Sequence, residues 1–217
     1  MLHNTSTFAL PLALVLCTGT TMQATQAATP ETEAPKAERP EVKVGDRWKF
    51  ACTGSNQKTE RRWEITSVEP TVIKGKENGQ PLTLTPDLNE LESPRRKLSE
   101  NKTLSFPLEV GKKWEFTNDA VLYGVVQTKI YRGEGQEKYA VSVDSYEKVR
   151  VPAGEFDAYK LAVFERFTDI QGAIFTTDSV LWYAPAARSI VKSDWVVHSA
   201  RRGTEHSCEL VEFRLQP

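Results

Sequence analysis

The sequence is poor in histidine and cysteine and has no excess of charge of either sign. Among its 217 residues are three His and three Cys, and 28 Lys and Arg are balanced by 29 Asp and Glu, so the net charge is −1. Proteins that bind nucleic acid through its phosphates usually carry a strong positive balance, which this chain lacks. We therefore expect no nucleic-acid partner.

Sequence motifs of the common catalytic and cofactor-binding sites are also missing. The chain contains no P-loop, no His-Glu-x-x-His helix, no Cys-x-x-Cys pair and no calcium-loop pattern. One grouping of metal-ligating residue types exists, Asp194, His198, His206 and Cys208, but its spacing fits no common zinc signature. We expect no metal and no cofactor, and the sequence favours a non-enzymatic protein over an enzyme.

Long apolar runs are absent as well. The N-terminal run over residues 8–17 is about ten residues long and is interrupted by Pro11, whereas a membrane-spanning helix needs roughly 20 residues. The first 28 residues have no charged side chain and end in small residues, which is typical of a cleaved secretory signal. The alternative is a lipoprotein signal that uses Cys17, but Leu16 stands where such signals usually have a small residue. We expect residues 1–28 to be removed, no transmembrane segment to remain, and the protein to be periplasmic or secreted by a bacterium.

Two regions follow the predicted signal. Residues 29–41 are rich in Pro and Glu and have little apolar content, which predicts a disordered tether. Residues 42–217 have the length of one ordinary domain, large enough to bury a core.

After removal of the signal, two cysteines remain, near the two ends of the domain. Cys52 and Cys208 in an exported chain favour a disulfide. Alternation places Cys52 on the same strand face as Trp48 and Phe50, and Cys208 on the same face as Leu210. A bridge between them would join the first and last strands of the domain. The alternative is two separate buried thiols.

Apolar and polar residues alternate with a period of two along most of the chain. Residues 139–151 have one apolar and one polar face, and residues 121–131 precede them across a glycine-containing turn, which predicts a hairpin. Further predicted strands cover residues 46–52, 60–68, 71–76, 82–85, 114–116, 156–167, 173–183, 189–198 and 205–215. The pattern predicts an all-β fold with a single strongly curved antiparallel sheet, either a half-barrel or a barrel-like meander.

One segment, residues 85–102, breaks this pattern. Thr85 and Pro86 can begin a short helix that ends at Pro94. The alternative is a polar loop that runs over the sheet or covers a cavity.

Large aromatic residues lie on or beside the predicted strands. On the concave side of a curved sheet, such side chains either fill the interior, which is the usual outcome in a small barrel, or line a hollow for an apolar ligand. The candidates for lining a hollow are Trp48, Trp63, Trp114, Phe156, Tyr159, Phe164, Trp182 and Trp195.

Three short motifs carry a resemblance to known proteins. Val-Gly-x-x-Trp begins at both Val44 and Val110, residues 151–160 read VPAGEFDAYK, and residues 182–185 read WYAP. With these motifs the chain resembles a broad group of secreted bacterial β-rich proteins of unknown function, which are similar to lipoprotein-carrier half-barrels. The resemblance covers most of residues 42–217. It implies a curved antiparallel sheet that encloses lipid on its concave face, and it supplies no catalytic residues.

Three functions are compatible with these patterns. The first is an exported non-enzymatic binding domain that holds a hydrophobic ligand, such as a lipid or acyl chain, or an envelope protein. The second is a hydrolase that acts on an envelope polymer through carboxylates that the sequence does not single out. The third is a structural or interaction module that uses an exposed edge strand.

Overall fold

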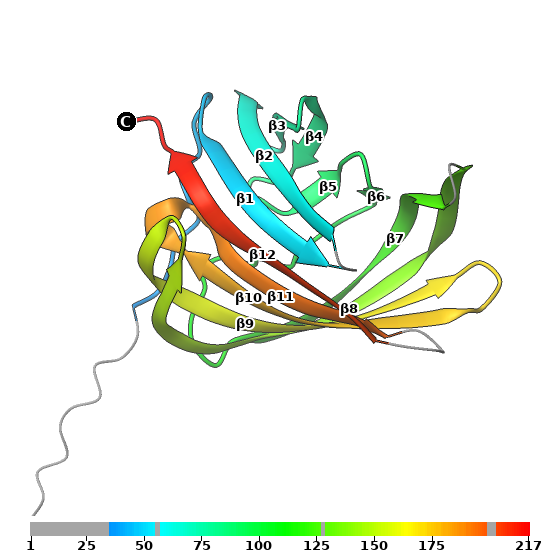
Figure 1. Ribbon diagram of the computed structural model, residues 1–217. Helices are drawn as coiled ribbons and strands as arrows, with labels where there is room; N and C mark the ends of the chain where they lie inside the picture. The colour runs from blue at the N-terminus through cyan, green and yellow to red at the C-terminus, as the bar shows by residue number, and fades with distance from the viewer. Residues whose placement is uncertain (1–34, 55–56, 127–128, 199–202) are drawn as a thin grey trace, which may run out of the picture. The chain divides into compact units, whose positions relative to one another are not determined.

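Figure 1 shows the computed structural model of the chain. The structure describes residues 35–54, 57–126, 129–198 and 203–217. The predicted signal and the first part of the predicted tether lie outside the described residues.

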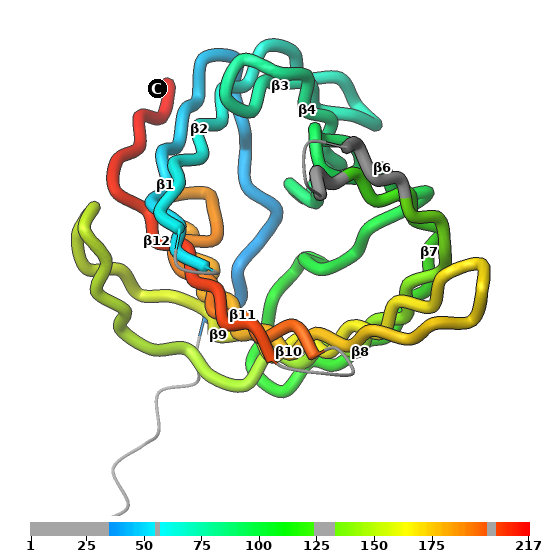
Figure 2. The backbone as a smooth tube through the Cα atoms, turned by 45° about the vertical axis from the view of Figure 1, so that its right-hand side comes forward, coloured from blue at the N-terminus to red at the C-terminus, as the bar shows by residue number. Residues whose placement is uncertain are grey.

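Apart from one short 3-10 helix, η1 (Pro185–Ala187), the regular structure in the described residues is β-strand. The strands are β1 (Arg47–Gly54), β2 (Gln57–Val68), β3 (Ile73–Glu77), β4 (Gln80–Leu84), β5 (Glu90–Glu92), β6 (Arg96–Leu98), β7 (Lys113–Val126), β8 (Lys129–Val151), β9 (Gly154–Asp169), β10 (Ile174–Ala184), β11 (Ser189–His198) and β12 (Gly203–Arg214). Each strand pairs antiparallel with its neighbours in sequence, and β12 also pairs with β1, which closes the sheet into a barrel (Figure 2). The predicted all-β antiparallel meander is confirmed, and its sheet closes rather than ending as a half-barrel. No helix in the described part of the chain is long and apolar enough to cross a membrane.

The first and last strands meet at a disulfide. The register of β1 and β12 places Cys52 directly opposite Cys208, and the two form a disulfide across 156 residues of sequence, as predicted. Trp48 and Phe50 precede Cys52 on the same strand face, and all three are buried. The disulfide therefore links the two ends of the domain at the point where the barrel closes.

Residues 85–102 contain the short strands β5 and β6 and no helix. The buried amide of Asn89 accepts a hydrogen bond from the Leu104 amide at 2.6 Å and donates one to the Leu104 carbonyl at 2.8 Å. Leu88, with a φ of 62°, lies outside the right-handed helical region. The short-helix alternative is therefore wrong, because Asn89 fixes the chain against residue 104 and the segment becomes part of the barrel wall between β4 and β7.

The chain before β1 packs against the barrel. Ala37 is buried and exchanges backbone hydrogen bonds with Leu108 at 2.9 and 2.8 Å. The Tyr159 hydroxyl donates to the Pro35 carbonyl. The described part of the tether predicted over residues 29–41 therefore contacts the barrel at Pro35 and Ala37, whereas Glu38, Arg39 and Glu41 remain exposed.

A tight hairpin joins β8 and β9 at Pro152 and Ala153. Gly154 follows with a φ of 139°, a conformation that residues with a side chain rarely adopt. The Ala153 amide donates to the Leu210 carbonyl of β12 at 3.0 Å. The VPAGEFDAYK motif therefore builds a turn that returns against β12.

The strands β2 and β7 extend past their shorter neighbours, β3 and β6, and side chains occupy part of the exposed backbone edges. Asn78 accepts a hydrogen bond from the Arg62 amide at 2.9 Å and donates one to the Glu60 carbonyl at 3.0 Å. On β7, the Asp119 backbone bonds Ser99 through both its carbonyl and its amide. Within the described strands, the free edge that an interaction module would need is therefore short.

Candidate functional site

A cavity of about 380 Å³ lies inside the barrel. The strands β1, β2, β10 and β11 supply its apolar wall, formed by Trp48, Phe50, Trp63, Leu181, Trp195 and Val197. Trp63 packs edge-on against Phe50, with the ring centroids 6.0 Å apart. Small-molecule sites commonly measure roughly 300–1,000 Å³, so the cavity has room for one small ligand.

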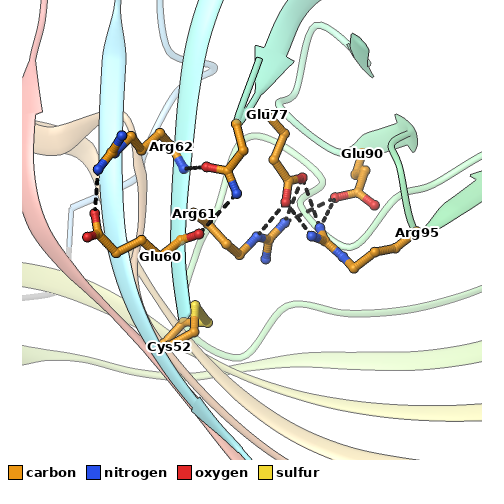
Figure 3. Close-up of a disulfide and its surroundings, with 9 residues drawn as sticks. Cys52, Glu60, Arg61, Arg62, Glu77, Glu90 and Arg95 are labelled. Carbon is orange, nitrogen blue, oxygen red and sulfur yellow. Dashed lines mark hydrogen bonds and ion pairs between the residues drawn. A yellow bond between two sulfur atoms is a disulfide. The ribbon is translucent and has the colours of Figure 1, made fainter. Parts of the chain in front are cut away.

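Charged side chains around β2 to β6 form a polar wall. Glu77 of β3, 2% exposed, accepts hydrogen bonds from Arg61 at 3.2 and 3.3 Å and from Arg95, one of them at 2.9 Å. Figure 3 shows Arg61 and Arg95 on either side of Glu77, with Glu90 near the same two arginines. Burial alone would raise the pKa of Glu77, but the Arg95 hydrogen bond and the Arg61 charge outweigh it and lower the pKa. Glu77 is therefore held as an anion.

A second group of charges surrounds Arg96 of β6. Its Nε lies 3.4 Å from the Glu90 carboxylate, and its charge interacts with Tyr139, Glu137 and Glu165. Burial would lower the pKa of Arg96, but the surrounding acidic groups raise it. The Tyr139 hydroxyl donates to Glu137 Oε2 at 2.8 Å. Arg96, whose side chain is 26% exposed, is therefore a partly buried cation shared among several acidic side chains.

Glu165 of β9 lines the cavity, whereas its neighbour Glu137 is not part of the cavity wall. The register of β8 and β9 places Glu165 opposite Tyr139. Burial raises the pKa of Glu165 to about 7, and the Glu137 charge adds to this effect, while Arg96 and the Tyr139 hydroxyl oppose it. Glu165 therefore changes its charge near neutral pH.

Two acceptor atoms beside this group, Glu137 Oε1 and Asn118 Oδ1, are buried without a hydrogen-bond partner among the described residues. Asn118 of β7 lies directly opposite Glu137 of β8, and the two residues are 3% and 0% exposed. A buried acceptor without a donor costs free energy. A third buried polar atom without a partner among the described residues, Trp63 Nε1, is a donor in the cavity wall, so the surplus of acceptors is confined to Asn118 and Glu137.

Three of the eight predicted aromatic residues, Trp48, Trp63 and Trp195, line the cavity. Trp48 Nε1 donates to the Ala187 carbonyl at 2.7 Å. The Trp195 ring stacks on His206, with the ring centroids 5.1 Å apart. These contacts hold the Trp48 and Trp195 rings in place in the cavity wall.

Three other candidates lie in packed parts of the barrel. Phe156 and Tyr159 are buried in the core, and Phe156 contacts Phe213 with ring centroids 5.8 Å apart. Trp114 is half-buried, and its Nε1 donates to the Lys102 carbonyl at 2.7 Å. These three side chains are not part of the cavity wall.

The last two candidates, Phe164 and Trp182, face away from the interior. Phe164 stands between two cavity-lining neighbours on β9 and is 43% exposed. Trp182 lies between Lys160 and Lys192, whose ammonium groups are 5.8 and 5.2 Å from its ring centre. Strand alternation places both rings on the outer face of the barrel. The prediction that they line a hollow relied on their aromatic character and did not take this alternation into account.

Seven charged residues of the interior were not predicted from the sequence. They are Arg61, Glu77, Glu90, Arg95, Arg96, Glu137 and Glu165. A signal was available, because Glu165 shares an otherwise apolar strand face with Val163 and Phe167. A charged side chain on such a face points into the core and requires a partner there.

The chemistry open to the cavity follows from its wall. Within the described ranges, no group of three or more His, Cys, Asp or Glu side chains could hold a metal ion. The described wall contains Ser179, Ser189 and Ser193 but no histidine that would activate them as nucleophiles. Glu165 faces the cavity without Glu137, so these two carboxylates do not flank one bond of a substrate. The arrangement is suited to binding a small molecule with one apolar and one polar part.

No family model matches the sequence, and a search of curated proteins found no match. Among solved structures, the chain is similar to a presumed exported protein with a YmcC-like fold from Bacteroides fragilis, with 14% identity, a TM-score of 0.49 and coverage of 82% of this chain and 99% of that one. It is also similar to the hypothetical lipoprotein YmcC from Escherichia coli (8% identity, TM-score 0.47, coverage 78% and 85%). A presumed lipoprotein from Parabacteroides distasonis has 12% identity, a TM-score of 0.46 and coverage of 83% and 100%. At these identities and scores the likenesses carry no argument about function.

Proposed function

We propose that the chain is an exported non-enzymatic binding protein of the bacterial envelope whose barrel interior holds one small amphipathic molecule. The observation that carries the proposal is the cavity of about 380 Å³, with tryptophan rings on one part of its wall and charged side chains on another. An apolar chain would lie against Trp48, Trp63 and Trp195, and a polar head group would lie against the charged side chains.

The size of the cavity limits the ligand. Its volume lies near the lower end of the roughly 300–1,000 Å³ of small-molecule sites, which suits a single chain of about ten carbon atoms rather than a whole phospholipid. Each buried methylene contributes about 0.8 kcal/mol, so such a chain supplies about 8 kcal/mol before the cost of losing its free motion. Apolar burial is therefore the main source of affinity.

A location outside the cytoplasm is supported by two features of the chain. The Cys52–Cys208 disulfide is of a kind that persists in oxidising compartments. The signal predicted over residues 1–28 would direct the chain there.

Binding of decanol to the purified chain tests the proposal. We expect a saturable change in tryptophan fluorescence and one bound decanol per chain in native mass spectrometry, because Trp63 and Trp195 line the cavity. Trp63→Phe should weaken decanol binding by about three- to tenfold, since part of the ring contact is lost. Trp182→Phe makes the same substitution on the outer face and should leave the affinity unchanged. A folded chain that shows no saturable binding of decanol would contradict the proposal.

A further inference from the structure

The charges beside the cavity do not balance. Two of the arginines, Arg61 and Arg95, are each paired with both Glu77 and Glu90. These four side chains together carry no net charge. Their ion pairs satisfy both guanidinium groups, so neither arginine is available as a partner for an anionic ligand without breaking an existing pair.

The cavity wall has two more arginines. Arg188 is paired with the buried Asp46 at 3.3 Å, and these two side chains also carry no net charge. Arg96 faces two further carboxyl groups, Glu137 and Glu165. Four arginines therefore meet four glutamates and one aspartate around the cavity. If both Glu137 and Glu165 are ionised, the site carries one uncompensated negative charge. A buried negative charge without a partner is unfavourable, so the site attracts either a proton or a cation.

The surroundings of Glu165 point to a cationic group. Glu137 Oε1 and Asn118 Oδ1 lie side by side on β8 and β7, outside the cavity wall, and both are buried acceptors without a donor among the described residues, so no described donor offsets the charge at that oxygen of Glu137. The faces of aromatic rings attract cations, and Trp48, Trp63 and Trp195 form part of the same cavity wall. A surplus of carboxylate next to tryptophan rings is a suitable environment for an ammonium group.

We propose that the polar end of the cavity receives a protonated amine, so that the ligand is an amphipathic amine rather than a fatty acid. This inference rests on the proposed function, because it names the head group of a ligand in the same cavity. The ammonium would donate to Glu165, the member of the Glu137 and Glu165 pair that lines the cavity, and would supply the missing positive charge. A carboxylate head group would meet the surplus of negative charge instead.

A proton on Glu165 competes with the ammonium. The charged and titratable groups that act on Glu165 are Glu137 and Tyr139 from β8 and Arg96 from β6, and its neighbour on β10 is the uncharged Thr177. Because the pKa of Glu165 is about 7, its carboxylate is mostly free of the proton at about pH 8 and mostly protonated at about pH 6. Affinity for an amine should therefore rise with pH across this range.

Three ligands with the same chain and different head groups test the inference. Binding of decylamine, decanol and decanoate is measured at about pH 8 by tryptophan fluorescence and calorimetry. We expect decylamine to bind roughly tenfold or more tightly than decanoate, because one is attracted and the other repelled by the site. Glu165→Gln should reduce this preference to within about threefold. Glu155→Gln, the same substitution on the exposed β8–β9 hairpin, should keep the preference.

The outcomes separate the two proposals. If none of the three ligands binds, the proposed function fails. If decanol binds but decanoate binds as tightly as decylamine, or if the preference survives Glu165→Gln, the amine inference alone is wrong. A pH series on the unmodified protein gives a test that depends on no variant. A decylamine affinity that does not fall between about pH 8 and about pH 6 contradicts the inference, because both ligand head groups keep their charge over this range.

Discussion

Two sides of the barrel use the same strand alternation to place different chemistry in the interior. The strands β3 to β6 have three to five residues each and direct Glu77, Glu90 and Arg96 inward. The strands β7, β8 and β9 have 14, 23 and 16 residues and bury apolar side chains such as Val141 and Leu161. The short strands are tied together by ion pairs, whereas the long strands are held by extended backbone pairing and apolar packing.

This difference separates structural charges from charges that are available for a ligand. On the short side, Arg61 of β2, Glu77 of β3 and Arg95 before β6 connect three segments that have few backbone hydrogen bonds of their own. On the long side, Glu137 and Glu165 lie in strands that are already secured and share a single cation. The charges of β2 to β6 therefore stabilise the barrel wall. The carboxyl group of β8 and β9 that has no cation of its own determines the charge that a ligand should carry.

Removal of an apolar side chain from the long side should have the largest effect. Leu161 is fully buried, and Leu161→Ala should lower the free energy of unfolding by about 3–4 kcal/mol, because it leaves a cavity in the core. Phe164→Ala changes the exposed face of the same strand and should cost less than about 1 kcal/mol. Urea unfolding measures both. A Leu161→Ala variant as stable as Phe164→Ala would show that the long side does not depend on apolar packing.

Removal of a charge from the short side should have a smaller effect. Glu77→Gln leaves Arg61 and Arg95 without their main anion and should lower the free energy of unfolding by about 2–3 kcal/mol. The expected loss in unfolding free energy is smaller than for a fully buried pair, because the Arg61 and Arg95 side chains are 27% and 46% exposed and water solvates them in part. Glu60→Gln removes an exposed carboxylate from β2 and should cause no measurable change in the same urea experiment. Equal stability of the two variants would mean that the ion pairs do not secure the short strands.

Much of the fold could be predicted because strand alternation and cysteine position are local properties of the sequence. The apolar face of residues 139–151 and the placement of Cys52 and Cys208 follow from the period of two. The segment over residues 85–102 could not be predicted in this way. Its conformation depends on the buried Asn89 amide and the Leu104 backbone, which are 15 residues apart and carry no sequence signal for their contact.

The candidate site could be predicted only in part. Alternation with Cys52 places Trp48 on the inner face, but the outward position of Phe164 was missed because residue type was given more weight than its place in the alternating pattern. The inward position of Glu165 could have been predicted from the same alternation. The closeness of Glu165 to Glu137 and Arg96 could not be predicted, because it depends on the register between β8 and β9 and on the pairing of β6 with β7.

The smallest expected effect concerns the pH dependence of stability. The pKa of Glu165 in the folded protein, about 7, is higher than its ordinary value of 4.5, so the folded chain holds this proton more tightly than the unfolded chain. Stability therefore falls as pH rises from about 4.5 to about 7, because only the unfolded chain has already lost the proton in this range. Above about pH 7 the folded chain carries the full cost of the buried charge, about 2 kcal/mol after allowance for partial exposure.

Glu165→Gln removes this cost. The variant tests the place where the two sides of the barrel meet, because Glu165 lies on the long side and its cation, Arg96, lies on the short side. We expect the variant and the unmodified protein to be equally stable at about pH 5, and the variant to be more stable by about 2 kcal/mol at about pH 8, as measured by urea unfolding. All other ionisable groups are present in both proteins, so their contributions cancel in the difference. A variant that is less stable at about pH 8 would mean that Arg96 holds Glu165 as a favourable anion. The surplus of negative charge would then be absent, and the preference for an amine would lose its physical basis.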